Sequence, residues 1–413
     1  MLSTVMRILL LGSLLLLCAE MAYCSSASLH GDITMGFTVD LYHAVRSVRK
    51  KGNILCSPTS ISVGLAMVAL GGRGTTLQQL RKGLHFDKGP EGEEFSMLKK
   101  QSSIMSTNSE KCQLKLANAL YIQDGYSLSQ QYLGGIQEFF DNAVRTVNFQ
   151  DSSSTANIIN KWIANQTSGK VNNLVSSHSF SPLTKLVLVN AIYFKGRWKH
   201  AFNSQNTRLM EFYKEGGSVV EIPMMHQQAM CRFGYFTAGE MRYQVLELPY
   251  SGEEVSITLA LPEEGADLVE LERHLTPQLI DKWDSTMVED EIEIGLPRFI
   301  IQQKLDLTEP LEVLNITEIF KAGADLSGMT ESADLHISQA VHRAFIEINE
   351  EGSEAAASTG LAAAIMSLPR HQFMANHPFM FLIRSKLTAA VLFVGRLMEP
   401  EKMISFGRDK EAL

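Results

Sequence analysis

An α+β fold is predicted by three features of this 413-residue chain. Apolar residues recur at helical spacing near the N-terminus, most clearly from Phe37 to Val48. Strand-like apolar runs come later, and Leu186 to Phe194 is almost continuously apolar, as expected for a central strand buried on both faces. Helical and strand segments show little strict alternation, and this order is typical of the α+β class.

Three helices are expected from their spacing and their flanking residues. The first, Phe37 to Val48, is amphipathic. The second, Ile61 to Leu70, follows the cap-type residues Ser57 to Ser60 and is apolar nearly all round, so it should be buried. The third, Thr155 to Gln166, has one apolar face and should cover a sheet.

Two hairpins are expected in the second half of the chain. Tyr243 to Pro249 and Val255 to Leu261 flank the turn-type segment Ser251 to Glu254, and the second of these runs alternates strictly. Phe379 to Ile383 and Ala389 to Gly395 form a second pair of strands.

The N-terminus has the pattern of a secretory signal peptide over residues 1–24. Arg7 precedes an apolar run from Ile8 to Ala19, and small residues follow near Cys24. This run is too short to cross a bilayer, which takes about 20 apolar residues. We therefore expect a secreted, extracellular protein whose residues 25–413 form a single domain.

Charge and cysteine content limit the classes of partner. Removal of residues 1–24 takes away one cation and one anion, so the net charge stays −8, which argues against nucleic acid or an anionic membrane as a partner. Cys56, Cys112 and Cys231 remain and do not make a disulfide framework, although their spacing does not show whether any two pair. The sequons at Asn165 and Asn315 predict a glycoprotein.

Motifs for catalysis are missing from the sequence. It contains no Gly-x-Ser-x-Gly, His-Glu-x-x-His or Cys-x-x-Cys motif, and its histidines are not paired at metal-ligand spacing. We therefore expect no enzyme activity, no cofactor and no metal.

The segment from Glu350 to Thr359 is built of small residues, which are poor material for a helix core or a strand core. As a strand it would place Ser353, Ala355 and Ala357 on one face, and no charge would lie on that face. These properties fit a segment that is first an exposed loop and later a strand inserted between packed strands. A flexible Ala/Ser linker is the alternative interpretation.

Several segments together resemble the serpin family over essentially the whole mature chain. The matching segments are Asn53–Gly74, Leu186–Phe202, Gly323–Ser327, His342–Ala357, Asn376–Leu382 and Leu392–Pro400. Within the family, the hinge sequence and the tail beyond Pro400 are most similar to the neuroserpin and pancpin branch. The resemblance implies three β-sheets, about nine helices and an exposed reactive-centre loop over residues 350–375, followed by a C-terminal tail over residues 401–413.

The resemblance also implies a function and a set of site residues. A serpin is a suicide inhibitor: its target serine protease cuts the loop and forms a covalent acyl-enzyme, and the cut loop then inserts into the central sheet. We expect this protease as the partner and a monomer as the inhibitor. The implied hinge residues are Gly352, Ser353, Glu354, Ala355, Ala356, Ala357, Ser358 and Thr359. The implied residues of the shutter, which holds the central strands together, are Ser57, Ser60, Asn190 and His342. The implied residues of the breach, at the top of the sheet, are Trp198, Arg298 and Glu350.

Family spacing from the hinge glycine predicts Met366–Ser367 as the reactive bond, with Ile365 as the rival for the first of these positions. Methionine is unbranched and uncharged, so the predicted target is elastase-like or chymotrypsin-like rather than trypsin-like. The competing hypothesis is a non-inhibitory serpin that acts as a carrier, a chaperone or a storage protein. A charged, bulky or proline residue on the inward face of the hinge would favour that alternative, and Ser353, Ala355 and Ala357 are none of these.

Overall fold

The structure, a computed structural model, describes residues 31–400 except 106–107, 110–111, 142, 351–370 and 389. The predicted signal peptide, hinge, reactive bond and C-terminal tail lie outside the described residues.

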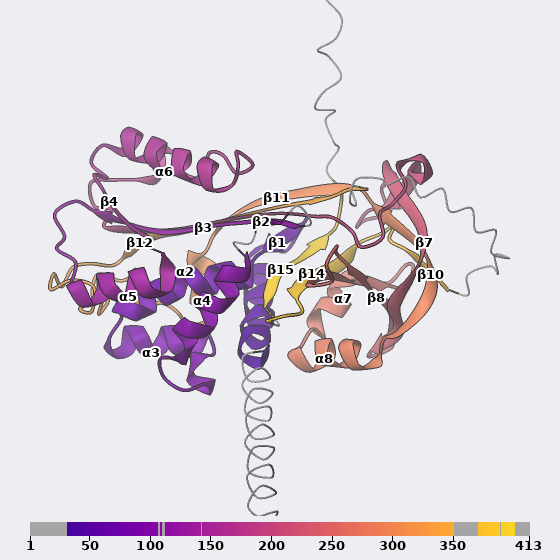
Figure 1. Cartoon of the computed structure of the whole chain (residues 1–413), viewed down its shortest axis with the longest axis horizontal. Coiled ribbons are helices and arrows are strands. Elements are labelled where there is room, and N and C mark those ends of the chain that lie inside the picture. The colour runs from indigo at the N-terminus through magenta and orange to yellow at the C-terminus, as the bar shows by residue number, and fades with distance from the viewer. Residues whose placement is uncertain are drawn as a thin grey trace, which may run out of the picture.

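A six-stranded sheet, which we call sheet A, lies at the centre of the molecule (Figure 1). Its strands run in the order β11-β12-β5-β3-β2, and β4 pairs with β3. The predicted apolar strand is β5, and all but one of its residues are buried. The strands are β2 (Asn108–Ser109), β3 (Cys112–Gln123), β4 (Val144–Val147), β5 (Leu186–Gly196), β11 (Phe299–Asp306) and β12 (Ile337–Ile348).

The other described strands form one nine-stranded sheet that is continuous through the long strand β7 (Val219–Ala238), and we call its two parts sheets B and C. The C-terminal part of β7 pairs with β8, continuing through β9, β14, β15 and β1 as sheet B, whereas its N-terminal part pairs with β6 and β10 as part of sheet C. The predicted hairpins are β8–β9 and β14–β15. The strands are β1 (Ile54–Cys56), β6 (Arg208–Tyr213), β8 (Met241–Pro249), β9 (Val255–Pro262), β10 (Val288–Pro297), β13 (His371–Met374), β14 (Phe379–Ser385) and β15 (Val391–Leu397).

Helices cover both faces of sheet A in Figure 1, with α6 on one side and α2, α4 and α5 on the other. Besides the first helix, residues 31–48, the α-helices are α2 (Pro58–Gly71), α3 (Gly74–Gly83), α4 (Glu93–Met105), α5 (Gln130–Phe140), α6 (Ser152–Gln166), α7 (Leu268–Arg273), α8 (Pro277–Thr286) and α9 (Thr308–Val313). The short 3₁₀ helices are η1 (Phe86–Lys88), η2 (Ser177–Ser179), η3 (Ser204–Asn206) and η4 (Glu318–Phe320). Within the described residues, these elements agree with the expected nine or so helices, and with three sheets when the two parts of the nine-stranded sheet are counted separately.

The start of α2 follows from its sequence. Ser57 is the N-cap, and its hydroxyl accepts a hydrogen bond from the main-chain N–H of Ser60 at 3.3 Å. Pro58 occupies the first turn, where its missing N–H costs nothing. As predicted, the helix is buried almost throughout, and it places Ser57 and Ser60 under the middle of sheet A.

A buried ion pair joins the C-terminal strand β15 to the helices beside it. Arg396 and Glu272 are both 0% exposed, and Nη1 of Arg396 lies 3.0 and 2.9 Å from the two carboxylate oxygens. The same guanidinium donates to the carbonyl oxygens of Arg49, Lys50 and Gly52, just beyond the first helix. Removing the carboxylate of Glu272 would leave the guanidinium of Arg396 buried without an anion, a change that costs about 3–5 kcal/mol.

Two of the cysteines are free thiols. Cys56 and Cys231 are buried and make no disulfide bond. Burial raises the pKa of each thiol to about 12. Neither group is therefore a reactive thiolate near neutral pH.

Candidate functional site

The boundary between β5 and β12 is the central feature of sheet A. The two strands are parallel neighbours, paired from Ile337 opposite Leu186 to Ile346 opposite Phe194. After β12 the chain passes Glu350 and enters the segment predicted as hinge and reactive loop, and it reappears at His371 in β13 of sheet C. The predicted loop therefore connects the end of a central strand of sheet A to a different sheet.

The predicted shutter residues meet beneath this boundary. Ser57, Ser60, Asn190 and His342 are all 0% exposed. The N–H of Ser57 donates to Nε2 of His342 at 3.2 Å, and Nδ1 of His342 is hydrogen-bonded to the side-chain oxygen of Asn190. The side-chain amide of Asn190 donates to the carbonyl oxygen of Ser60 at 2.6 Å. These bonds connect α2, β5 and β12 at one point.

Asn118 on β3 is a further member of this network that the sequence did not single out. Its side-chain oxygen accepts from the amide of Asn190 and, at 3.3 Å, from the hydroxyl of Ser60. Its own amide donates to the carbonyl oxygen of Ser60 at 3.1 Å. The available signal was a single asparagine within the otherwise apolar run Leu116–Tyr121, but one asparagine in a strand is more often an ordinary surface group.

Burial fixes the charge state of His342. Removal from water lowers the pKa of its imidazole to about 3, so the ring is neutral at physiological pH. Because Nε2 must accept the N–H of Ser57, the ring proton sits on Nδ1 and is donated to Asn190. Protonation of the ring would bring two N–H groups face to face at Ser57.

Trp198, one of the predicted breach residues, lies against the chain just after the end of β12. Its indole N–H donates to the main-chain oxygen of Asn349 at 2.8 Å. Its ring stacks on Tyr250, with centroids 4.6 Å apart and planes inclined by 11°. Trp198 is only 3% exposed, so it fixes the point where the chain leaves sheet A.

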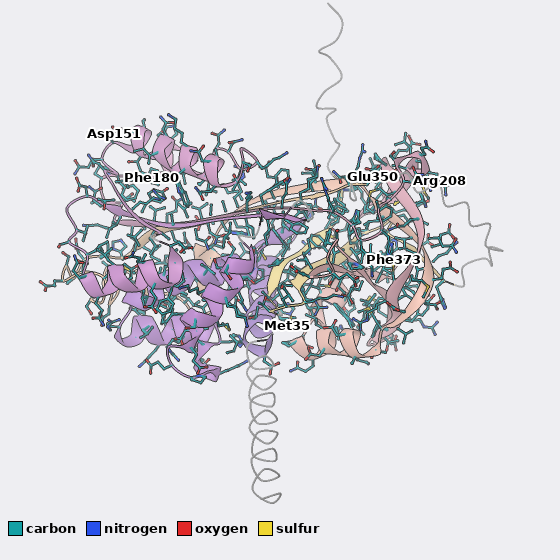
Figure 2. The ribbon with its side chains drawn as sticks, in the orientation of Figure 1. Met35, Asp151, Phe180, Arg208, Glu350 and Phe373 are labelled. Atoms are coloured by element: carbon teal, nitrogen blue, oxygen red, sulfur yellow. The ribbon has the colours of Figure 1, made fainter. Side chains whose placement is uncertain are left out.

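Arg298 and Glu350 form an ion pair at the same end of the sheet. Nη1 of Arg298 lies 3.2 Å from Oε2 of Glu350. The hydroxyl of Thr207, which the sequence did not indicate, donates to Oε1 of Glu350 at 2.8 Å. Figure 2 places Glu350 beside Arg208, which begins β6, so this carboxylate anchors the first residue of the predicted loop to sheet C.

The two glycosylation sequons lie at the surface of the molecule. Asn165 lies in the last turn of α6 and Asn315 lies in a turn after α9, and both residues are exposed. Within the described residues, no cluster of three or more histidine, cysteine or acidic side chains could hold a metal ion. No helix in this part of the chain is long and apolar enough to span a membrane.

The site is arranged to hold two parallel strands together without catalytic groups. Parallel pairing is slightly less stable per residue than antiparallel pairing. A strand running opposite to β5 and β12 and placed between them would replace one parallel boundary with two antiparallel ones. The contacts of the predicted shutter and breach residues lie along the boundary that such a strand would enter.

Comparisons with known proteins agree with this arrangement. The family model described as serpin (serine protease inhibitor) matches residues 32–400. The chain is 47% identical over 378 residues to serpin I2 of Homo sapiens, covering 91% of this chain and 93% of that one. It is 42% identical over 381 residues to neuroserpin of Gallus gallus, again covering 91% and 93%.

The fold of the chain is also similar to solved structures. Native protease nexin-1, solved with heparin, superposes with a TM-score of 0.83 at 32% identity, covering 91% of this chain and all of that one. The predicted similarity to the neuroserpin and pancpin branch is confirmed by the sequence relatives. The description of the matching family is that of a protease inhibitor and not of an enzyme. The chain therefore belongs to the serpin family of serine protease inhibitors.

Proposed function

We propose that this chain is a secreted suicide inhibitor of serine proteases that acts as a monomer. The target protease cuts the reactive loop, residues 350–375, at Met366–Ser367. The cut loop then enters sheet A between β5 and β12 and carries the protease with it. The protease remains attached as an acyl-enzyme because its active site is distorted.

The observation that carries this proposal is the parallel pairing of β5 and β12 directly before the hinge. A segment that follows β12 and folds back runs antiparallel to both strands, so it gains ladder hydrogen bonds on both edges. The small residues Ser353, Ala355 and Ala357 would share the inward face. No bulky or charged group would then have to pass between the packed strands.

The trapping step is an interrupted acyl transfer. The protease serine oxygen attacks the carbonyl carbon of Met366, and the bond to Ser367 breaks with the proton going to the leaving amine. The protease is then esterified to Met366, which belongs to the moving segment. Hydrolysis of this ester is the step that insertion prevents.

The target class follows from the side chain at the cut. Methionine fills an apolar primary pocket and has no charge for a buried carboxylate. The target is therefore an elastase-like or chymotrypsin-like protease. Oxidation of Met366 to the sulfoxide puts a polar group into that pocket and should slow inhibition.

The test is complex formation with a panel of serine proteases. Elastase and chymotrypsin should each give a complex that survives SDS, whereas a protease whose active-site serine is replaced by alanine should give none. Trypsin should react slowly. Cleavage of the loop without any stable complex would favour the non-inhibitory alternative of carrier, chaperone or storage protein. Fast trypsin inhibition with cleavage after Arg370 would overturn the assignment of the bond.

Secretion and glycosylation can be tested separately, by the mature N-terminus and by enzymatic removal of N-linked glycans. The mature N-terminus should be Ser25, after removal of residues 1–24. Both Asn165 and Asn315 are exposed, so treatment of secreted protein with peptide N-glycosidase should convert each to aspartate, and a peptide map should detect both conversions.

A further inference from the structure

A cluster of soft donor atoms lies on sheet C, where the strands β6, β7, β10 and β13 are neighbours. The cluster consists of Met210 on β6, His226 on β7 and Met374 on β13. All three residues are partly buried, so they are shielded from water but can still be reached by a small solute. Arg208 and Phe373, which are labelled in Figure 2, mark this end of the molecule.

The first two members of the cluster are in direct contact. Nε2 of the His226 imidazole lies 3.0 Å from Sδ of Met210. Nδ1 of the same ring is buried and has no hydrogen-bond partner within the described residues, so no bond at Nδ1 determines which nitrogen carries the ring proton. The lone pair of Nε2 is therefore available to a ligand when the ring proton sits on Nδ1.

Gly295 on β10 brings the third member to the same place. Gly295 pairs with His226 on one side and with Met374 on the other, so the three residues form one row on one face of the sheet. A Cβ atom on Gly295 would lie 2.1 Å from Sδ of Met374 and 3.5 Å from Cε1 of His226. The sulfur therefore occupies the space that a side chain would fill, with the edge of the imidazole beside it. Because methionine has three rotatable side-chain bonds, the sulfurs of Met210 and Met374 can both turn toward Nε2.

The imidazole of His226 is mainly neutral at physiological pH. Burial lowers the pKa of His226, the positive charge of Arg208 lowers it further, and the negative charge of Glu293 opposes both. A neutral imidazole keeps a lone pair for a metal ion. Arg208 and Glu293 carry opposite charges, so the surroundings supply no net negative charge that would favour a divalent ion over a monovalent one.

We propose that Met210, His226 and Met374 bind one monovalent copper ion, Cu(I), through two thioether sulfurs and Nε2. Thioether sulfur is a soft ligand that favours Cu(I), whereas Mg²⁺ and Ca²⁺ need oxygen ligands and Zn²⁺ sites are built from thiolate, imidazole and carboxylate. Methionine ligands leave no mark in the spacing of the histidines, which is why the sequence alone indicated no metal. The bound ion would tie β13, the first strand after the predicted loop, to β6 and β7.

The test is competition for Cu(I) with the coloured chelator bicinchoninate, at pH 7.4 with ascorbate and without oxygen. Every protein is the mature chain with Cys112→Ser, because the side chain of Cys112 lies outside the described residues and a thiol would also bind Cu(I). Cys56 and Cys231 are buried, and their raised pKa values keep them as thiols. The parent should withdraw one equivalent of Cu(I), and X-ray absorption at the copper edge should show two sulfur neighbours and one nitrogen neighbour. No withdrawal of copper, or fewer than two sulfur neighbours, would overturn the proposal.

Variants locate the bound ion. Met210→Leu and Met374→Leu nearly conserve the side-chain volume but remove the sulfur. Each should weaken Cu(I) binding at least about tenfold, the lower end of the loss that follows removal of even a supporting group of a metal site. Met230→Leu removes a sulfur from a residue of β7 that is 56% exposed and outside the cluster, so it should bind Cu(I) as the parent does.

Gly295→Ala tests the geometry without removing a ligand. The added Cβ would take the place of Sδ of Met374, so the sulfur must move and Cu(I) binding should weaken. Gly134→Ala is the control, because a Cβ there would meet no atom within 4 Å. Cu(I) should also raise the melting temperature of the parent and of Met230→Leu but not that of Met374→Leu, since a ligand stabilises only a state that binds it. If Met210→Leu and Met374→Leu bind Cu(I) as tightly as Met230→Leu, the proposal is wrong.

Discussion

The imidazole of His342 on β12 donates its Nδ1 proton to the side-chain oxygen of Asn190 on β5, so one hydrogen bond crosses the boundary at which the two parallel strands meet. The same ring accepts the main-chain N–H of Ser57 at the start of α2. The charge state of one buried histidine is therefore tied to the closure of sheet A.

Acid should weaken the native state through His342. The folded pKa of about 3 lies below the unfolded value of about 6.5, so the unfolded chain binds more protons between these values. Stability is then lost as pH falls from about 6.5 towards 3, by about 2 kcal/mol at pH 5 relative to pH 8.

The measurement for this prediction is urea unfolding at pH 8 and pH 5, for the parent and for His342→Gln. The variant should lose less stability on acidification, because glutamine does not titrate. Equal pH dependence in the two proteins would show that His342 does not contribute.

Asn118→Ala should loosen the shutter. The variant removes one acceptor from the amide of Asn190 and one donor from the carbonyl oxygen of Ser60. The expected loss is about 1–2 kcal/mol, read as a lower urea midpoint and a faster loss of inhibitory activity on storage. Gln113→Ala, at an exposed position of the same strand, is the control and should change neither value.

Ser353→Arg should convert the inhibitor into a substrate. The guanidinium would have to enter the buried face of sheet A without a partner, which is costly, whereas the reactive bond itself is unchanged. Glu354→Arg is the matched control, because residue 354 would face the opposite side of the inserted strand. SDS gels with the target protease should show cleaved Ser353→Arg and covalent complex for Glu354→Arg. Covalent trapping by Ser353→Arg would argue against insertion of this hinge.

The peptide released by an inhibited protease should begin at Ser367. This follows from the family spacing that assigns the reactive bond to Met366–Ser367. Mass spectrometry of the denatured complex identifies the terminus directly. A peptide beginning at Met366 would move the bond to Ile365, and any other start would reject the assignment.

Cleavage of the loop should raise the melting temperature sharply. The inserted segment would add ladder hydrogen bonds on both sides and bury Leu361 and Ile365. Differential scanning calorimetry of intact and cleaved protein measures the change. The cleaved Ser353→Arg variant should show little increase, and a parent that melts no higher after cleavage would favour the non-inhibitory alternative.

Elements with one dominant pattern could be predicted from the sequence. The apolar run of strand β5 and the Ser57 cap of helix α2 each indicate one type of element, whatever the neighbouring segments are. The long strand β7 has no such signal. It exchanges partners near Arg232, from β10 to β8, and its middle carries polar residues on both faces. Its course depends on tertiary pairing, which local periodicity does not encode.

The site divides in the same way. Asn190 and His342 could be assigned only because the segments around them resemble a known family, since a buried asparagine or histidine alone indicates little. Asn118 and Thr207 lie outside the matching segments. Their roles arise from residues 58 or more positions distant in sequence, such as Ser60 for Asn118 and Glu350 for Thr207. Contacts of this kind appear only when the chain is folded.

The position of β14 and β15 has a consequence for the fate of the cut protein. Both strands come after the reactive bond in sequence, yet they lie inside sheet B, between β1 and β9. Arg396 ties β15 to Glu272 and to carbonyl oxygens beyond the first helix. Proteolysis should therefore yield two polypeptides that stay together as one particle, separable only by denaturant. The protease would remain esterified to the larger polypeptide, which ends at Met366. The smaller polypeptide would keep β14 and β15 in sheet B and so leave that sheet complete.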